Sequence, residues 1–222
     1  AARGALVAGD RDAAERAFGR LSELSGASDA GGQTLQDLAR EARLTRSSGV
    51  AASLDIAADA RPAHVGTARA AAGVWAGLGS WNNAVARARK LVEARPDASS
   101  SHGVLASILL ARASSEGGRP NGAGGDPAAE TAFRDAIAAL ERAAALDPSG
   151  VTFPERLMRA WAARGESGNA GRWAAEALER DALSRLDPVA GLSDSSARLA
   201  RRLVANETGA ERTPDGSDGP GG

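Results

Sequence analysis

The stretch GLGSWNNAVARARKLVEARPD, residues 77–97, carries the pattern that decides the fold of this chain of 222 residues. Ala84, Ala88 and Leu91 follow one another at steps of four and three, which places their side chains on one face of a helix. Pro96 lies twelve residues after Ala84 and closes the helix, because proline cannot continue it. The stretch therefore predicts an amphipathic helix with a small-residue contact face.

The same spacing recurs along the chain, so this helix is one copy of a repeated unit. Each copy starts from a small or apolar origin residue, and the origins are Ala14, Val50, Ala84, Ala136 and Ala170. Successive origins are 36, 34, 52 and 34 residues apart, and the outlier is one 34-residue period plus 18. Trp75 and Trp161 each precede an origin by nine residues, and Gly79 and Gly165 each by five. A bundle of unrelated helices would not keep this register.

A unit of 34 residues with paired helices and a closing proline resembles the tetratricopeptide repeat (TPR). The residues that carry the resemblance are Trp75, Gly79, Trp81, Ala84, Ala88 and Pro96 in one copy, Leu157, Met158, Trp161, Gly165, Ala170 and Ala174 in another, and Leu105, Ala106, Ala136, Leu140 and Pro148 in a third. The first large aromatic residue of the family is missing, so a related helical-hairpin solenoid stays the structural alternative. The resemblance implies an all-α, right-handed α-solenoid of about five helix-turn-helix repeats.

Four segments follow from this pattern. We expect residues 1–206 to form the solenoid, truncated at its N-terminus because the first copy begins within its leading helix. A flexible insert is expected at 114–127, which is rich in glycine and proline. Residues 193–206 read as a capping helix, with Leu199 and Leu203 facing inward. Residues 207–222 are polar and are expected to be disordered.

The composition favours helices and excludes several functions. Apolar residues make up 43% of the chain but aromatic residues only 3%, which favours close contact between alanine-rich helices. A net charge of −1 gives no electrostatic case for nucleic acid, and the absence of cysteine excludes disulfides and thiolate chemistry. The longest apolar run, at 104–111, is too short to span a bilayer, and no signal peptide is visible. The compartment stays open between cytoplasm and periplasm, and the strong preference for arginine over lysine indicates a GC-rich, bacterial gene.

The residues available for catalysis are few, and no cofactor or metal site is expected. The chain has two histidines, and we expect His64 in a turn between repeats and His102 at a helix start to be structural or solvent-exposed. Trp75 and Trp161 are expected in the core because they occupy matching repeat positions. Trp173 falls off the apolar stripe of its helix and is expected to be an exposed or contact residue.

The resemblance implies a binding groove made from the first helix of each pair, which in the family binds peptides or protein surfaces. The matching positions include Arg69, Ser107, Glu155, Arg156 and Arg159. Lysines and asparagines, which chaperone-binding members use to hold a C-terminal carboxylate, are absent there, so that specificity is not carried over. Arginine suits an acidic segment instead.

The predicted function is therefore a non-catalytic scaffold or adaptor that binds a protein or peptide. The alternative is the helical-repeat portion of a larger enzyme, such as a kinase or glycosyltransferase, whose catalytic domain lies outside this chain. Neither the oligomeric state nor the identity of the partner follows from the sequence.

Overall fold

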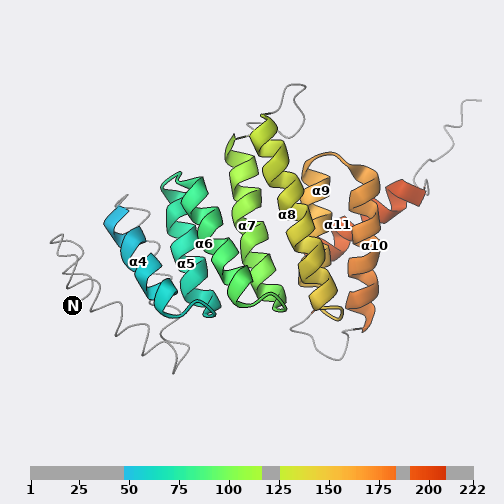
Figure 1. Cartoon of the computed structure of the whole chain (residues 1–222). Helices are drawn as coiled ribbons and strands as arrows, with labels where there is room; N and C mark the ends of the chain where they lie inside the picture. Colours follow the sequence, from blue (N-terminus) through green and yellow to red (C-terminus); the bar gives the residue numbers. More distant parts are fainter. Residues whose placement is uncertain (1–47, 117–125, 184–190, 209–222) are drawn as a thin grey trace, which may run out of the picture. The chain divides into compact units, whose positions relative to one another are not determined.

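The computed structural model describes residues 48–116, 126–183 and 191–208, and its regular elements in these ranges are all helices (Figure 1). In chain order they are α4 (Ser48–Ala60), α5 (Val65–Gly77), α6 (Trp81–Ala94), α7 (Ser99–Glu116), α8 (Pro127–Leu146), α9 (Thr152–Ala163), α10 (Ser167–Leu183) and α11 (Asp194–Thr208). The expected all-α class is confirmed.

The chain divides into two compact units at the boundary between Leu146 and Asp147. Among the described helices of unit 1, each of α4 to α7 packs against the next one, and α5 also packs against α7. In unit 2, α10 packs against both α9 and α11. The helices thus form antiparallel hairpins, with α5 and α6, α7 and α8, and α9 and α10 as the pairs (Figure 1).

The turn inside a hairpin has the same geometry in both units. Gly79 and Gly165 both have φ of 75°, a left-handed conformation that glycine adopts without steric cost. The backbone N–H after each glycine donates to the carbonyl five residues earlier, from Ser80 to Trp75 at 2.9 Å and from Glu166 to Trp161 at 3.1 Å. This six-to-one hydrogen bond is the Schellman motif that ends a helix at a glycine. The predicted glycine positions are therefore the turns of two equivalent hairpins.

The contact face predicted from the origin residues is buried in the copies formed by α6, α8 and α10. These residues are Ala84, Ala88 and Leu91 in α6, Ala136, Leu140 and Ala143 in α8, and Ala170, Ala174 and Ala177 in α10. None of them is more than 1% exposed. Small side chains here let the helices of a hairpin approach closely, so the structure confirms a TPR-like helical repeat. The right-handed superhelix and its continuity between the two units stay predictions, and the first copy lies outside the described residues.

The helices beside the expected insert are longer than the sequence pattern indicates. The expected insert begins at residue 114, but α7 continues to Glu116. At the other side α8 begins at Pro127, preceded by Asp126, whose carboxylate accepts a hydrogen bond from the N–H of Ala128 at 2.9 Å. Proline is well tolerated at a first helical position. Residues 117–125 lie outside the described part of the chain, so their expected flexibility stays a prediction.

The C-terminal helix α11 covers unit 2 as a cap, as expected. Ser193 accepts a hydrogen bond from the N–H of Ser196 at 3.3 Å, so its hydroxyl caps the helix. Leu199 and Leu203 pack against a buried cluster, while the arginines of the other face are exposed. The helix continues to Thr208, two residues beyond the expected end, and the rest of the predicted tail lies outside the described residues.

Trp75, Trp161 and Trp173 are all half-buried, so Trp173 is not exposed and does not differ in burial from the two tryptophans that were expected in the core. Trp173 is also half-buried, because it packs against a cluster that includes Met158 of α9 and Ala200 of α11. Its indole lies 5.0 Å from the guanidinium of the neighbouring Arg172, in a cation–π contact. The apolar stripe within one helix did not reveal this position, since α11 comes from a later segment.

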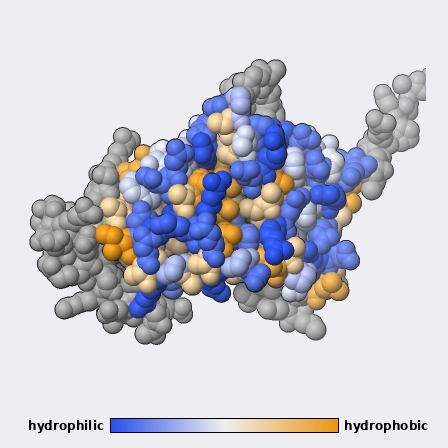
Figure 2. All heavy atoms as spheres, viewed as in Figure 1, coloured by the Kyte–Doolittle hydropathy of each residue, from blue (hydrophilic) through white to orange (hydrophobic). Residues whose placement is uncertain are grey.

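Hydrophilic atoms cover much of the face seen in Figure 2, and hydrophobic atoms show through between them.

Candidate functional site

The structure places the five predicted groove residues in two separate groups. Arg69 on α5 and Ser107 on α7 belong to unit 1, and both are exposed. Glu155, Arg156 and Arg159 lie together on α9 in unit 2.

In unit 1, α5 and α7 present a surface of small side chains that we call the first-helix face. It is defined by residues that recur at helical spacing on the two helices, Arg69 and Gly73 on α5, and Ser107, Ala111 and Ser114 on α7. Because α4, α6 and α8 cover the other sides of these two adjacent helices, the exposed positions are left on one common side. The face has room for another chain to approach closely.

At three positions of this face little or no side chain projects outward. The hydroxyl of Ser107 donates to the carbonyl of Gly103 at 2.7 Å, and that of Ser114 donates to Leu110 at 2.9 Å, so both turn back onto their own helix. A methyl group added at Gly73 would meet no atom within 4 Å. Arg69 is the charged residue of the face and forms no ion pair within the described ranges.

The predicted groove residues of unit 2 are already engaged within the chain. Arg159 forms an ion pair with Glu155 at 3.0 Å and donates a hydrogen bond to the hydroxyl of Ser196 at 2.8 Å. The Ser196 hydroxyl in turn donates to Glu155 at 2.5 Å, and the serine is fully buried. These bonds attach α11 to α9. Arg159, predicted as a groove residue, therefore also takes part in the packing of α11 on α9.

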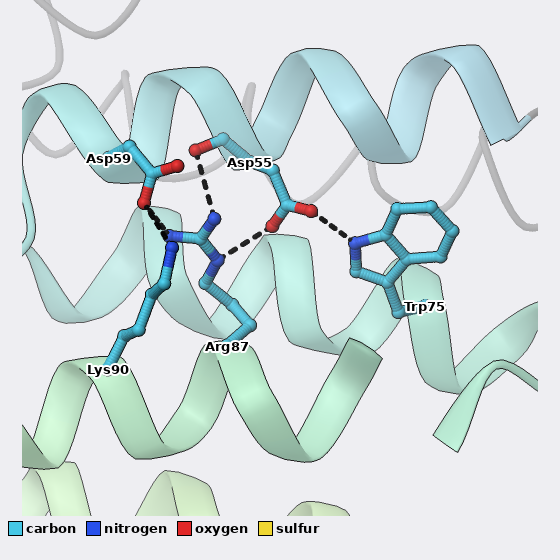
Figure 3. Close-up of polar contacts among 5 residues, drawn as sticks. All are labelled: Asp55, Asp59, Trp75, Arg87 and Lys90. Carbon is cyan, nitrogen blue, oxygen red and sulfur yellow. Dashed lines mark hydrogen bonds and ion pairs between the residues drawn. The ribbon is translucent and has the colours of Figure 1, made fainter. Parts of the chain in front are cut away.

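Sequence reasoning missed the strongest polar cluster of the described residues, which joins α4, α5 and α6 (Figure 3). We call it the α4–α6 clasp, and it consists of Asp55, Asp59, Trp75, Arg87 and Lys90. The guanidinium of Arg87 donates to a carboxylate oxygen of Asp55 at 2.6 Å, to its backbone carbonyl at 3.2 Å and to Asp59 at 2.8 Å. The indole N–H of Trp75 donates to the second Asp55 oxygen at 2.6 Å, and Lys90 donates to Asp59 at 3.1 Å.

The clasp is a structural ion pair rather than a reactive centre. Burial of Arg87, whose side chain is 6% exposed, opposes its charge, but the hydrogen bond to Asp59 and the charges of both aspartates outweigh this and raise its pKa. The hydrogen bond from Arg87 is the main reason that the pKa of Asp59 lies below its ordinary value. Both groups therefore stay charged at neutral pH and hold consecutive repeats together.

Both histidines form hydrogen bonds with nearby backbone groups. His64 is the N-cap of α5, where its ring nitrogen accepts from the N–H of Thr67 at 3.2 Å. The Nε2 of His102 lies 2.8 Å from the carbonyl of Pro96, to which it donates. The described ranges hold no group of three acidic, histidine or cysteine side chains able to bind a metal ion. Nor does any helix in these ranges have the length and apolarity to cross a membrane.

Comparisons with known proteins give similarity only at the level of solved structures. No protein-family model matches the chain, and no curated protein matches its sequence. TTC0263, a thermophilic TPR protein of Thermus thermophilus, is 18% identical with a TM-score of 0.48, over 82% of this chain and 93% of that one. MamA of Desulfovibrio magneticus RS-1 is 15% identical with a TM-score of 0.43, over 85% and 98%. The type IV pilus biogenesis factor PilW is 16% identical with a TM-score of 0.31, over 83% and 89%.

Proposed function

We propose that this TPR-like chain is a non-catalytic interaction scaffold that binds a peptide or protein segment on the first-helix face of unit 1. The observation that carries the proposal is Gly73. Glycine inside a helix is less stable than alanine by about 1 kcal/mol, and a methyl group there would meet no atom within 4 Å. The packing of the described residues therefore gives no reason for glycine at this position, whereas close approach by a partner backbone does.

The charge of the face favours a partner with a carboxylate. Arg69 is exposed one helical turn from Gly73 and has no carboxylate partner in the described part of the chain. A guanidinium can hold a carboxylate through two parallel hydrogen bonds, each of which is stronger than a bond between neutral groups. An acidic segment passing over Gly73 would place a side chain within reach of Arg69.

The proposal is tested by a pull-down from host-cell lysate with the Arg69→Ala/Gly73→Leu double variant. The Cβ atom of a residue at 73 meets open space, so the leucine variant should fold while its binding face is blocked. The matched control is Arg95→Ala/Gly168→Leu, which removes one exposed arginine and fills one equally open glycine position elsewhere. Wild type and control should recover the same partners, in a salt-sensitive manner, and the double variant should lose them. Recovery of those partners by the double variant would refute the proposal.

A further inference from the structure

A second surface of unit 1 has the form of a binding cleft. A hollow of about 560 Å³ lies between α6 and α8, with α7 as its floor. Val85, Leu109 and Ala132 line its bottom and belong to the buried core cluster, so the floor is apolar. The cleft falls within the range of volumes that ligand sites occupy. It is made by α6 and α8, the second helices of their hairpins, and is distinct from the first-helix face.

The cleft lies between α6 and α8, where the next repeat lacks a pairing equivalent to the α4–α6 clasp. Counted from the origin residues, Asp55 of α4 and Arg89 of α6 occupy the same repeat position, five residues on. The position three residues after the origin is Arg87 in α6 but Ala139 in α8. The acid–base pair that joins α4 to α6 is therefore absent between α6 and α8. In the next repeat the position of Asp55 holds the basic Arg89, and the position of Arg87 holds the uncharged Ala139.

The guanidinium of Arg89 is consequently only weakly paired within the described residues. Among the described residues Arg89 forms an ion pair with Asp135, at 3.9 Å, and the two side chains are 60% and 47% exposed. Arg87 by contrast is 6% exposed and binds its two carboxylates at 2.6 and 2.8 Å. A long, exposed ion pair contributes almost nothing to stability, so an incoming carboxylate can replace Asp135 at Arg89.

A second guanidinium lines the cleft from α7. Arg112 is held by Glu116 at 2.9 Å and lies 3.5 Å from the side-chain oxygen of Asn82, which fixes its orientation. Its Nη2 forms no bond to any described residue. Asn82, beside which the Arg112 guanidinium lies, and Arg89 are seven residues apart on α6, so their Cα atoms are about 10 Å apart along the helix axis.

We propose that the cleft between α6 and α8 is a docking site for an acidic segment of a partner protein. The segment places an apolar side chain over Val85 and Leu109 and one carboxylate each at Arg89 and Arg112. A peptide suits this arrangement better than a free carboxylate does, because it can join two carboxylates, one for each arginine, to an apolar side chain. The carboxylate of Asp135 on the rim and the net charge of −1 disfavour a nucleic acid.

The test selects random peptides displayed on phage against the immobilised chain, with an Arg89→Ala/Arg112→Ala variant as the counter-selection target. Fluorescence anisotropy then gives the Kd of the most enriched peptide. We expect enriched peptides to combine acidic and apolar residues. Arg89→Ala should raise Kd by about fivefold or more, whereas Asp135→Asn should lower it by removing the internal competitor. Arg95→Ala, which removes an exposed arginine at the C-terminal end of α6, should leave Kd unchanged.

Three results would overturn the inference: no enrichment, enriched peptides without acidic residues, or a Kd that Arg89→Ala does not change. Arg69→Ala/Gly73→Leu should not affect the cleft peptide, which separates this site from the first-helix face. A peptide that depends on Arg69 and not on Arg89 would support the proposed function and overturn this inference.

Discussion

The α4–α6 clasp predicts a large and specific loss of stability in Arg87→Met. Methionine keeps an apolar stem of similar length and removes the guanidinium, so the change mainly breaks the hydrogen bonds to Asp55 and Asp59. Removing one partner of a fully buried ion pair costs about 3–5 kcal/mol. Here the two aspartates are 27% and 53% exposed and can regain hydration, which reduces the expected loss to about 2–3 kcal/mol.

The assay is urea unfolding followed by far-UV circular dichroism, together with native-state hydrogen exchange on α4. Because α4 is joined to α6 through the clasp, exchange should accelerate there more than in α8. Lys90→Met is the control, since Lys90 is 55% exposed and reaches the same Asp59 carboxylate. Its loss should stay below about 1 kcal/mol. Equal losses for the two variants would refute the assignment of Arg87 as the central residue of the clasp.

Three further predictions concern the clasp, the turns and the cap. The pKa of Asp59 is lowered in the folded state, chiefly by the hydrogen bond from Arg87. The stabilisation that the charged Asp59 contributes is therefore present above its ordinary pKa of about 4 and is lost as the pH falls through the lower folded value. The fall in unfolding free energy from about pH 6 to 3 should consequently be smaller in Arg87→Met than in the wild type. Gly79→Ala should cost about 1–2 kcal/mol because alanine is strained at φ of 75°, whereas Gly168→Ala, in open space, should not destabilise, as urea unfolding will show. Trp173→Ala should cost about as much as Trp161→Ala, roughly 3 kcal/mol or more, and a loss under about 1 kcal/mol would contradict its packing against the α11 cluster.

The repeat itself could be predicted because its signals are local. The steps from Ala84 to Leu91 lie within one helix, and their burial follows from helical periodicity alone. Gly79 and Gly165 mark the turns because a Schellman motif requires a left-handed residue at that position. These signals can be recognised within a single repeat, without knowledge of the neighbouring repeats.

The clasp and the cap could not be found this way, because each depends on a pairing between different segments. Arg87 and Asp55 are 32 residues apart, and the residues equivalent to Arg87 in later repeats are Ala139 and Trp173, so no recurring charge marks the position. That repeat position is nevertheless half-buried or buried in all three described copies. Comparing it between copies would have indicated that Trp173 is covered and that Arg87 needs a partner.

The predicted binding residues divide for the same reason. Helical spacing correctly placed Arg69 and Ser107 on the exposed side of their helices. It could not show that Glu155 and Arg159 are occupied, since their partner Ser196 belongs to a helix that begins more than 30 residues later. Only the folded chain brings these groups together.

Photo-cross-linking from position 73 tests the central claim most directly. Benzoylphenylalanine in place of Gly73 would project from the first-helix face into open space, and the same residue in place of Gly168 provides a control at another open glycine. On irradiation in host cells, position 73 should cross-link to a partner protein through a segment that mass spectrometry identifies as acidic, and position 168 should not. The absence of a cross-link at 73, or the same product from both positions, would contradict the account.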